Sequence, residues 1–358
     1  MNPATDKWLH FPGWKGFAAT GLLALTGAVC AATSPAAPTT GGPLGADSDV
    51  AAKTRALAQA NAAVVGIRAT AVDDARSIET LGRQRQGSGV VIAPGGLVLT
   101  IGYLILEADR VDLVVEGRRS VPARVVAYDL ATGFGLLQAL TPLDLPPVRL
   151  GSSSALSDEE PLMISSGGED GDLSLARMVS KRAFSGYWEY HIEGALFTSP
   201  PRTDHSGAGL FNIHGELLGI GSLMVGDALG PGRPRLPGNM FVPIDLLKPI
   251  LGELRERGAS RGSTRAWLGL SSVEQDGVVR VLRISRDSPA DQAGIRPGDS
   301  ILSIDGISVD GLETLYKNLW RDGPQREVTL EIRRGDQAQT IRLNSVDRMQ
   351  TLSRPKGI

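Results

Sequence analysis

Histidine is scarce in this chain, which limits the chemistry that the sequence can support. The 358 residues contain four histidines, of which His10 precedes the first apolar run and the others are His191, His205 and His214. Residues 11–190 therefore supply no imidazole base. The last three are spaced by 14 and 9 residues, which matches no compact metal-ligand pattern, so we expect no metal site.

Cysteine, aromatic residues and net charge are also low. The only cysteine, Cys30, lies in the N-terminal apolar run, so the rest of the chain can form no internal disulfide. A formal net charge of −2 shows no basic footprint, and we expect no nucleic-acid partner. With 5% aromatics but 44 glycines and 22 prolines, the composition is typical of many short strands joined by turns. No motif indicates a cofactor.

The first 32 residues have the pattern of an export signal. Lys7 and Lys15 precede an apolar run over residues 16–32 that ends in small residues. The run is short and rich in alanine, glycine and threonine for a spanning helix. We expect a cleaved signal peptide and a periplasmic or cell-envelope location. The alternative is a segment that stays in the inner membrane as an anchor. Residues 33–60 are predicted to be a flexible linker with a short helix over residues 50–60.

Residues 61–257 read as a β-rich domain. Their apolar runs are short and separated by turn residues, as in the predicted hairpin whose strands at 89–92 and 97–99 flank Pro94-Gly95-Gly96. Helical spacing of leucine and isoleucine returns only over residues 244–257. The pattern predicts a mainly β body that is closed by a C-terminal helix.

Five motifs in this region carry a family resemblance, and they occur in one order along the chain. They are Gly87-Ser88-Gly89-Val90-Val91-Ile92, Leu97-Val98-Leu99-Thr100, His205-Ser206-Gly207-Ala208-Gly209-Leu210-Phe211-Asn212, Gly215-Glu216-Leu217-Leu218-Gly219-Ile220 and Asn239-Met240-Phe241-Val242-Pro243-Ile244. The set resembles the protease domain of the Deg/HtrA family of exported serine proteases. The resemblance covers about residues 60–345 and implies a two-barrel trypsin-like (chymotrypsin-fold) domain followed by one PDZ domain.

The resemblance also places the catalytic positions. Ser206 stands at the nucleophile position, but Tyr103 stands where the family has its histidine base and Gly133 where it has its aspartate. Asp204 replaces the glycine whose backbone helps to bind the oxyanion, and we expect its carboxylate to oppose the charge that develops there. A tyrosine stays protonated at neutral pH and cannot shuttle a proton as imidazole does.

These replacements favour an inactive protease fold. Losing the base of a triad costs about a million-fold in turnover, roughly 8 kcal/mol. We therefore interpret Ser206 as a small residue that a tight loop tolerates. The alternative is an active serine-type endopeptidase in which a rearranged base serves Ser206, and His191 is the histidine that position alone does not exclude. His205 adjoins Ser206, and its side chain should point away from the hydroxyl.

Residues 258–346 resemble a family PDZ domain. Arg265-Ala266-Trp267-Leu268-Gly269-Leu270 is similar to a carboxylate-binding loop with its first strand, and residues 288–294 read as a short capped helix with a glycine stop. A last helix over residues 309–320 follows. In a PDZ domain a peptide adds as a strand beside residues 268–270, and its terminal carboxylate is held by backbone N–H groups. The predicted peptide-binding residues are Leu268, Gly269, Leu270, Leu312, Leu315, Tyr316 and Leu319.

Together these patterns predict an exported Deg/HtrA-like pseudoprotease. Its PDZ domain would bind protein or peptide C-termini or unfolded segments, and the chain would scaffold or regulate protein quality control in the envelope. An active Deg/HtrA relative is a further candidate partner. Family members are often trimers built through aromatic residues ahead of the first barrel, and residues 33–66 contain none, which argues against a homotrimer. Residues 347–358 are predicted to be a disordered tail.

Overall fold

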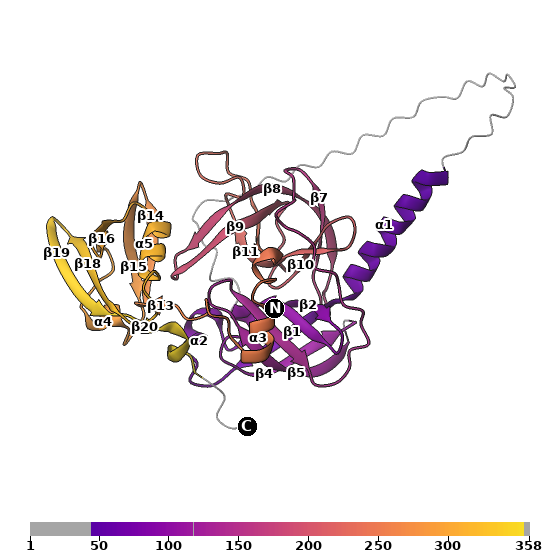
Figure 1. Cartoon of the computed structure of the whole chain (residues 1–358), viewed down its shortest axis with the longest axis horizontal. Coiled ribbons are helices and arrows are strands. Elements are labelled where there is room, and N and C mark those ends of the chain that lie inside the picture. The colour runs from indigo at the N-terminus through magenta and orange to yellow at the C-terminus, as the bar shows by residue number, and fades with distance from the viewer. Residues whose placement is uncertain (1–43, 117, 354–358) are drawn as a thin grey trace, which may run out of the picture. The chain divides into compact units, whose positions relative to one another are not determined.

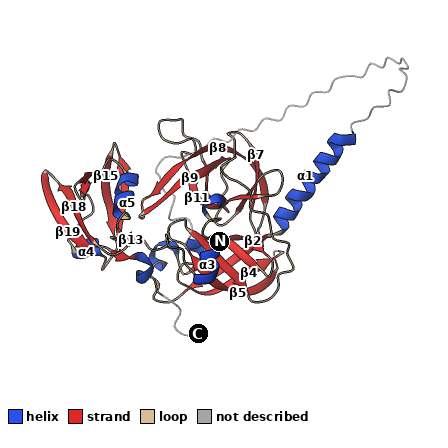
Figure 2. Cartoon of the chain, in the orientation of Figure 1, coloured by secondary structure: helices blue, strands red, loops and turns tan. Residues whose placement is uncertain are grey.

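The computed structural model describes residues 44–116 and 118–353 (Figure 1). The chain divides into two compact units, Met1–Ala51 and Ala52–Ile358. The predicted export signal and residues 354–358 lie outside the described residues. Among the described helices, none is long and apolar enough to span a membrane. Strands dominate the second unit, as Figure 2 shows.

The first half of this unit is a closed six-stranded barrel with the strand order β1-β2-β3-β6-β5-β4. Most positions of β1 and β4 are buried, and closure of the barrel leaves no free edge. The predicted hairpin is confirmed, because β2 pairs with β3 across the Pro94–Gly96 turn. The strands are β1 (Val64–Ala71), β2 (Gln84–Ala93), β3 (Leu97–Ile101), β4 (Ala108–Val115), β5 (Arg119–Tyr128) and β6 (Phe134–Ala139).

A second closed barrel follows with the order β10-β11-β12-β9-β8-β7. Its strands are β7 (Pro161–Ser165), β8 (Leu173–Gly186), β9 (Tyr190–Ser199), β10 (Gly209–Phe211), β11 (Leu217–Val225) and β12 (Gly238–Pro243). The β8–β9 hairpin is the longest, and its tip is Tyr187-Trp188-Glu189. Side chains from both barrels share one apolar core, which includes Phe134 and Phe197. The two-barrel architecture predicted from the sequence is confirmed.

The C-terminal part is a smaller β-domain with its own apolar core. Its main sheet has the order β14-β15-β16-β18-β19, with β17 paired to β16, and β13 pairs separately with β20. The strands are β13 (Ala266–Trp267), β14 (Leu270–Gln275), β15 (Val278–Ile284), β16 (Ser300–Ile304), β17 (Ile307–Ser308), β18 (Glu327–Arg334), β19 (Gln337–Asn344) and β20 (Val346–Asp347). Helix α4 (Pro289–Gln292) is capped by Ser288, whose hydroxyl accepts from the Asp291 N–H, as the sequence predicted. Helix α5 (Leu312–Leu319) buries the predicted leucine and tyrosine stripe.

Four local predictions differ from the structure. The first helix is longer than expected, with α1 covering Leu44–Ala62. The expected helix over residues 244–257 is two pieces, the 3-10 helix η3 (Ile244–Leu246) and α3 (Leu251–Arg257), because the chain turns between them. Helix α2 (Ile78–Leu81) was not foreseen. The predicted disordered tail is wrong up to residue 353, since β20 and the 3-10 helix η4 (Arg348–Thr351) pack on the protein and the Ser353 N–H donates to Glu107.

The linker between the barrels and the smaller domain is fixed at one buried carboxylate. Asp129 follows β5 and is completely inaccessible to solvent. One of its oxygens accepts from the Thr132 backbone and hydroxyl, and the other accepts from the hydroxyls of Ser260 and Ser263. Four donors compensate for the burial of the charge. The linker is thereby attached to the first barrel.

Candidate functional site

The Ser206 hydroxyl faces a tyrosine. Tyr103 lies on the 3-10 helix η2 (Gly102–Leu104) of the first barrel, and its hydroxyl is 2.7 Å from Ser206 Oγ and 2.9 Å from the Ser222 backbone oxygen. It carries one hydrogen and so donates to one of these acceptors at a time. Burial raises the pKa of Tyr103 to about 12, against the opposing influence of the Ser206 hydrogen bond. The phenol is therefore protonated at neutral pH and is a poor proton acceptor for the serine.

Backbone contacts with both barrels hold the loop that carries Ser206. The Ser88 N–H donates to the Ser206 carbonyl at 2.8 Å, and the Gly207 N–H donates to the Gly221 carbonyl at 2.8 Å. Gly207 has a φ of +75°, and a Cβ atom there would lie 1.9 Å from the Ser88 oxygen. Only glycine fits this position. The Ser-Gly pair thus has a structural reason to be present that does not require chemistry at Ser206.

The position of the family's aspartate has no room for a side chain. Gly133 has a φ of +81°, and a Cβ atom would lie 3.0 Å from the Tyr190 hydroxyl. That hydroxyl donates to the Thr132 carbonyl at 2.7 Å and so is fixed. The carboxylate of Asp129, four residues before Gly133, is occupied by the four donors described above.

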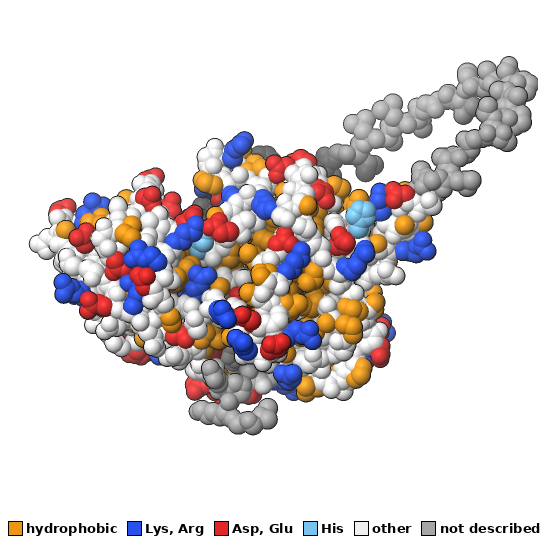
Figure 3. All heavy atoms as spheres, in the orientation of Figure 1, with side chains coloured by type: hydrophobic (Ala, Val, Ile, Leu, Met, Phe, Trp, Pro, Cys, Tyr) orange, Lys and Arg blue, Asp and Glu red, His pale blue; other side chains and the backbone are white. Residues whose placement is uncertain are grey.

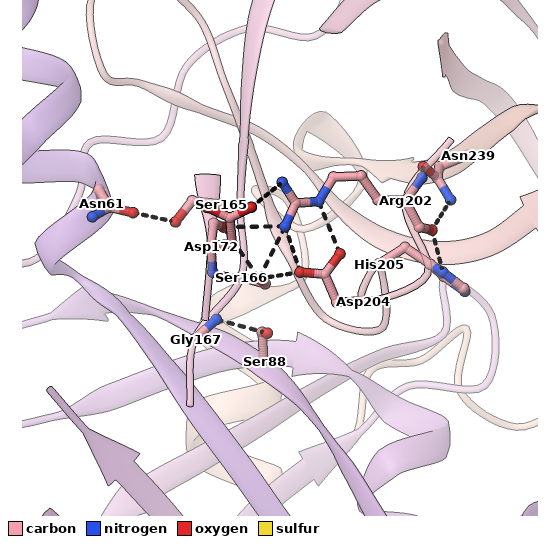
Figure 4. Close-up of polar contacts among 10 residues, drawn as sticks. All are labelled: Asn61, Ser88, Ser165, Ser166, Gly167, Asp172, Arg202, Asp204, His205 and Asn239. Carbon is pink, nitrogen blue, oxygen red and sulfur yellow. Dashed lines mark hydrogen bonds and ion pairs between the residues drawn. The ribbon is translucent and has the colours of Figure 1, made fainter. Parts of the chain in front are cut away.

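The Asp204 carboxylate is paired rather than free, as Figure 4 shows. It accepts from Ser166 and from the Arg202 guanidinium, which donates through both Nε and Nη2. Burial alone would raise its pKa, but the hydrogen bonds from Arg202 and Ser166 and from its own backbone N–H hold the pKa of Asp204 below the usual value. The sequence led us to expect that this carboxylate opposes the charge of an oxyanion, and its ion pair with Arg202 offsets part of that negative charge.

The histidines of the second barrel have other partners. His205 Nδ1 lies 3.0 Å from the Arg202 carbonyl (Figure 4). His191 lies in β9, with Nδ1 2.9 Å from the Ser185 hydroxyl and Nε2 3.2 Å from Glu193. His214 is exposed in the turn between β10 and β11. Among the described residues, the groups within reach of one cation are His191, Glu193 and Glu313. The Lys317 ammonium already pairs with both of those glutamates, so this cluster holds its own cation.

The second candidate site is the loop before β14, and it is occupied by the chain itself. The N–H groups of Gly269 and Leu270 donate to Oε1 of Glu189 at 2.8 and 2.7 Å, and the Leu268 N–H donates to both carboxylate oxygens at 3.2–3.3 Å. Three successive amides thus bind the carboxylate of an internal glutamate, in the loop where the resemblance predicted the terminal carboxylate of a peptide. The strand that borders it is β14, which begins only at Leu270, whereas β13 ends at Trp267.

The other predicted peptide-binding residues are deeply buried. Leu268, Leu270, Leu312, Leu315, Tyr316 and Leu319 are at most 6% exposed and belong to the core of the smaller domain. Tyr316 differs from the leucines, because its hydroxyl reaches out of the core to the Gly186 carbonyl at 2.8 Å.

Three functional contacts were missed in the sequence. Glu189 gave no signal, because a single glutamate at a hairpin tip is ordinary and its target lies 79 residues or more away in the chain. Arg202 is close enough to Asp204 in sequence for the ion pair to have been foreseen. Asp129 precedes Gly133 by four residues, but its role in holding the linker depends on Ser260 and Ser263, which no local pattern connects to it.

Comparison with known proteins identifies both domains. Residues 87–220 match the trypsin-like peptidase domain family, and residues 266–344 match the PDZ domain family. The chain thus combines a trypsin-like peptidase domain with a PDZ domain, and it is similar to Deg/HtrA proteins in sequence and in fold.

Sequence relatives in the Deg/HtrA family are named as proteases. A protein of Hahella chejuensis named "Probable periplasmic serine endoprotease DegP-like" is 28% identical over 271 residues, which is 71% of this chain and 55% of the relative. The mitochondrial serine protease HTRA2 of Bos taurus is 26% identical over 74% of this chain and 63% of its own length. The chain therefore spans a little over half of the DegP-like relatives that it matches.

Solved structures of the family support the fold. The HtrA-type protease AlgW with a decapeptide superposes with a TM-score of 0.52 at 18% identity, over 83% of this chain and 98% of AlgW. The serine endoprotease from Yersinia pestis superposes with a TM-score of 0.50 at 21% identity, over 82% and 97%. At such identities the likeness shows the fold alone.

Proposed function

We propose that this Deg/HtrA-like protein is a pseudoprotease that binds protein termini or unfolded segments through its PDZ domain. The observation that carries the first half is the hydrogen bond between Ser206 and Tyr103. A serine becomes a nucleophile when a neighbouring base takes its proton, and the group within reach is a phenol whose pKa is raised. Gly133 offers no carboxylate to orient a base.

The competing function is an active serine endopeptidase, and the names of the relatives favour it. It requires a base that reaches Ser206 by another route. The histidine candidates are His191 and His205. His191 would have to leave Ser185 and Glu193, and His205 would have to leave the Arg202 carbonyl. We favour the pseudoprotease because these imidazoles are engaged elsewhere and the oxyanion position is altered.

Active-site labelling separates the two functions. A fluorophosphonate probe reacts with activated serines, so we expect no labelling of Ser206 and no cleavage of an unfolded protein substrate. The S206A variant is the matched control. Labelling of the natural chain that disappears in S206A would establish the endopeptidase.

The second half of the proposal rests on the loop before β14. Its amides already hold a carboxylate in a geometry that suits a peptide C-terminus, and the related AlgW structure contains a decapeptide. The ligand would be a protein or peptide that ends in an apolar residue. An active Deg/HtrA relative is a further proposed partner, whereas homotrimer formation is not part of the proposal. Both charge signs are interspersed on the face in Figure 3, as the low net charge predicts.

The proposed location is the periplasm or cell envelope, which agrees with the names of several relatives. If residues 1–32 are a cleaved signal, the mature protein should begin near residue 33 and fractionate with soluble envelope proteins. Intact mass from the native cell tests this. A species in the membrane pellet that retains the N-terminal residues would indicate the anchored form instead.

A further inference from the structure

Glu189 stands at the tip of the β8–β9 hairpin of the second barrel, yet it lies in the carboxylate loop of the PDZ domain. Its side chain is buried, with the residue 5% exposed. The three amides that it engages are the ones that a peptide C-terminus would use. An internal glutamate therefore takes the place of a terminal carboxylate.

The backbone of the hairpin tip also behaves as a ligand. The Ser272 N–H, on β14, donates to the Tyr187 carbonyl at 2.8 Å, which is the kind of bond that an added peptide strand would make. On the other side, the Tyr316 hydroxyl of α5 donates to the Gly186 carbonyl at 2.8 Å and lies 3.3 Å from the Glu189 N–H. Strand β14 and helix α5, the two elements between which a peptide would bind in the groove of a PDZ domain, thus both contact the hairpin tip.

Two further features hold the tip in this position. Glu189 has a φ of +54°, a left-handed conformation that few residues other than glycine, asparagine and aspartate adopt readily. Such backbone strain persists where surrounding contacts impose it. Arg348 of η4 donates to the Trp188 carbonyl at 3.0 Å, and Trp188 stacks on Tyr190 with the ring centroids 5.6 Å apart.

We propose that the β8–β9 hairpin is an internal ligand of the PDZ domain, with Glu189 as its carboxylate, and that it keeps the groove closed until a C-terminal peptide displaces it. The inference rests on the proposed peptide-binding function and adds its regulation. A peptide can bind only those molecules in which the hairpin has left the groove. Its apparent association constant is therefore the intrinsic constant multiplied by the fraction of open molecules.

The test uses the full chain and two variants of Glu189. E189N retains a residue that tolerates positive φ but is one methylene too short to make the same contacts. E189Q keeps the length and one acceptor oxygen, but it loses the other of the two oxygens that accept from the Leu268 N–H. E331Q is the matched control, because Glu331 also lies in the PDZ domain, where it accepts from the Ser303 hydroxyl and is remote from the hairpin contacts. Circular dichroism and thermal melting establish that each variant is folded.

The first measurement needs no peptide. Hydrogen–deuterium exchange of the segment 266–272 reports the protection of the loop amides. We expect E189N to raise exchange there, E189Q to raise it less, and E331Q to leave it unchanged. Unchanged exchange in both folded Glu189 variants would overturn the internal-ligand inference.

The second measurement uses fluorescein-labelled ten-residue peptides that end in valine or leucine with a free carboxylate. Anisotropy should show at least ~10-fold tighter binding to E189N than to the natural chain, the scale of losing hydrogen bonds to a charged group. Equal affinity for the natural chain, E189N and E331Q would overturn the gating role. A third outcome is possible, in which E189N raises amide exchange but neither the natural chain nor any variant binds either peptide. That result would support the internal ligand and would contradict the proposed binding of peptide C-termini.

Discussion

The Ser206 loop and the PDZ carboxylate loop differ in the contacts that their backbone and side chains make. The backbone of the Ser206 loop is fixed by Ser88 and by Gly207, whereas its hydroxyl contacts the Tyr103 phenol. The loop at Leu268–Leu270 keeps all three donors in working geometry, but they are already engaged by Glu189. In the first loop the backbone is held in place but the serine faces a phenol, and in the second loop the donors are in place but already bind a carboxylate.

The largest free-energy difference concerns the catalytic base that Tyr103 replaces. The Y103H variant should remain unlabelled by a fluorophosphonate, because Gly133 supplies no carboxylate to orient the imidazole. Roughly 8 kcal/mol separates a complete triad from one without its base, on the order of a million-fold in rate. Serine labelling in Y103H that is absent from the Y103H/S206A double variant would show that the loop has kept more of its chemistry than its contacts indicate.

The next effect concerns stability and distinguishes shape from chemistry within the same loop. G207A should lower the free energy of unfolding by on the order of 3 kcal/mol, because its Cβ would meet the Ser88 carbonyl and its φ is left-handed. S206A should change it by less than about 1 kcal/mol, the loss of one hydrogen bond. Urea denaturation of both variants measures the difference. Similar costs for the two would contradict a loop that is retained for its backbone.

How far the sequence could predict these two sites follows from how local each one is. The barrels, the capped helix α4 and the stripe on α5 could be predicted because strand alternation, caps and helical spacing are read over a few residues. The replacements at Tyr103 and Gly133 could be read from motif positions. The Glu189 contact could not, because it joins a hairpin tip to a loop 79 residues on. The pairing of Asp204 with Arg202 joins residues that are two apart in the chain, so it could have been predicted.

A smaller effect tests the carboxylate loop directly. In E189N, where the groove should be open, amidating the peptide terminus removes the charge that the loop amides bind. We expect affinity to fall by ~1.5–3 kcal/mol, the range for hydrogen bonds to charged groups. Matched free-acid and amide peptides in an anisotropy titration measure this. Equal affinities would mean that the groove does not recognise a terminal carboxylate.

The smallest effect is a dependence on pH. Burial raises the pKa of Glu189 from 4.5 to about 7, against the lowering influence of Arg348 and the loop amides. Because the closed state holds the proton more tightly than the open one, closure is favoured most below about pH 4.5 and weakens as the pH rises through 7. The free-acid peptide should therefore bind the natural chain roughly tenfold more tightly at pH 8 than at pH 5.5.

Burial raises the pKa of the neighbouring Tyr316 well above its usual range, so this phenol stays protonated throughout the window. E189Q is the control, since it keeps every other titratable group of the hairpin, His191 included. It should bind with nearly the same affinity at both pH values. A natural chain whose affinity is equally flat would contradict the proton linkage.

The attachment of the linker to Asp129 has a consequence for which ligands could compete. Because Ser260 and Ser263 are bound to that carboxylate, the PDZ domain is held on a short tether, and the hairpin meets its groove as an intramolecular ligand. Short tethers give effective concentrations on the order of millimolar. A single free chain end at micromolar concentration competes poorly against that. A cluster of unfolded chains presents many chain ends together and raises their local concentration to the millimolar range. The number of clustered ends would therefore govern displacement of the hairpin more than the affinity of any single end.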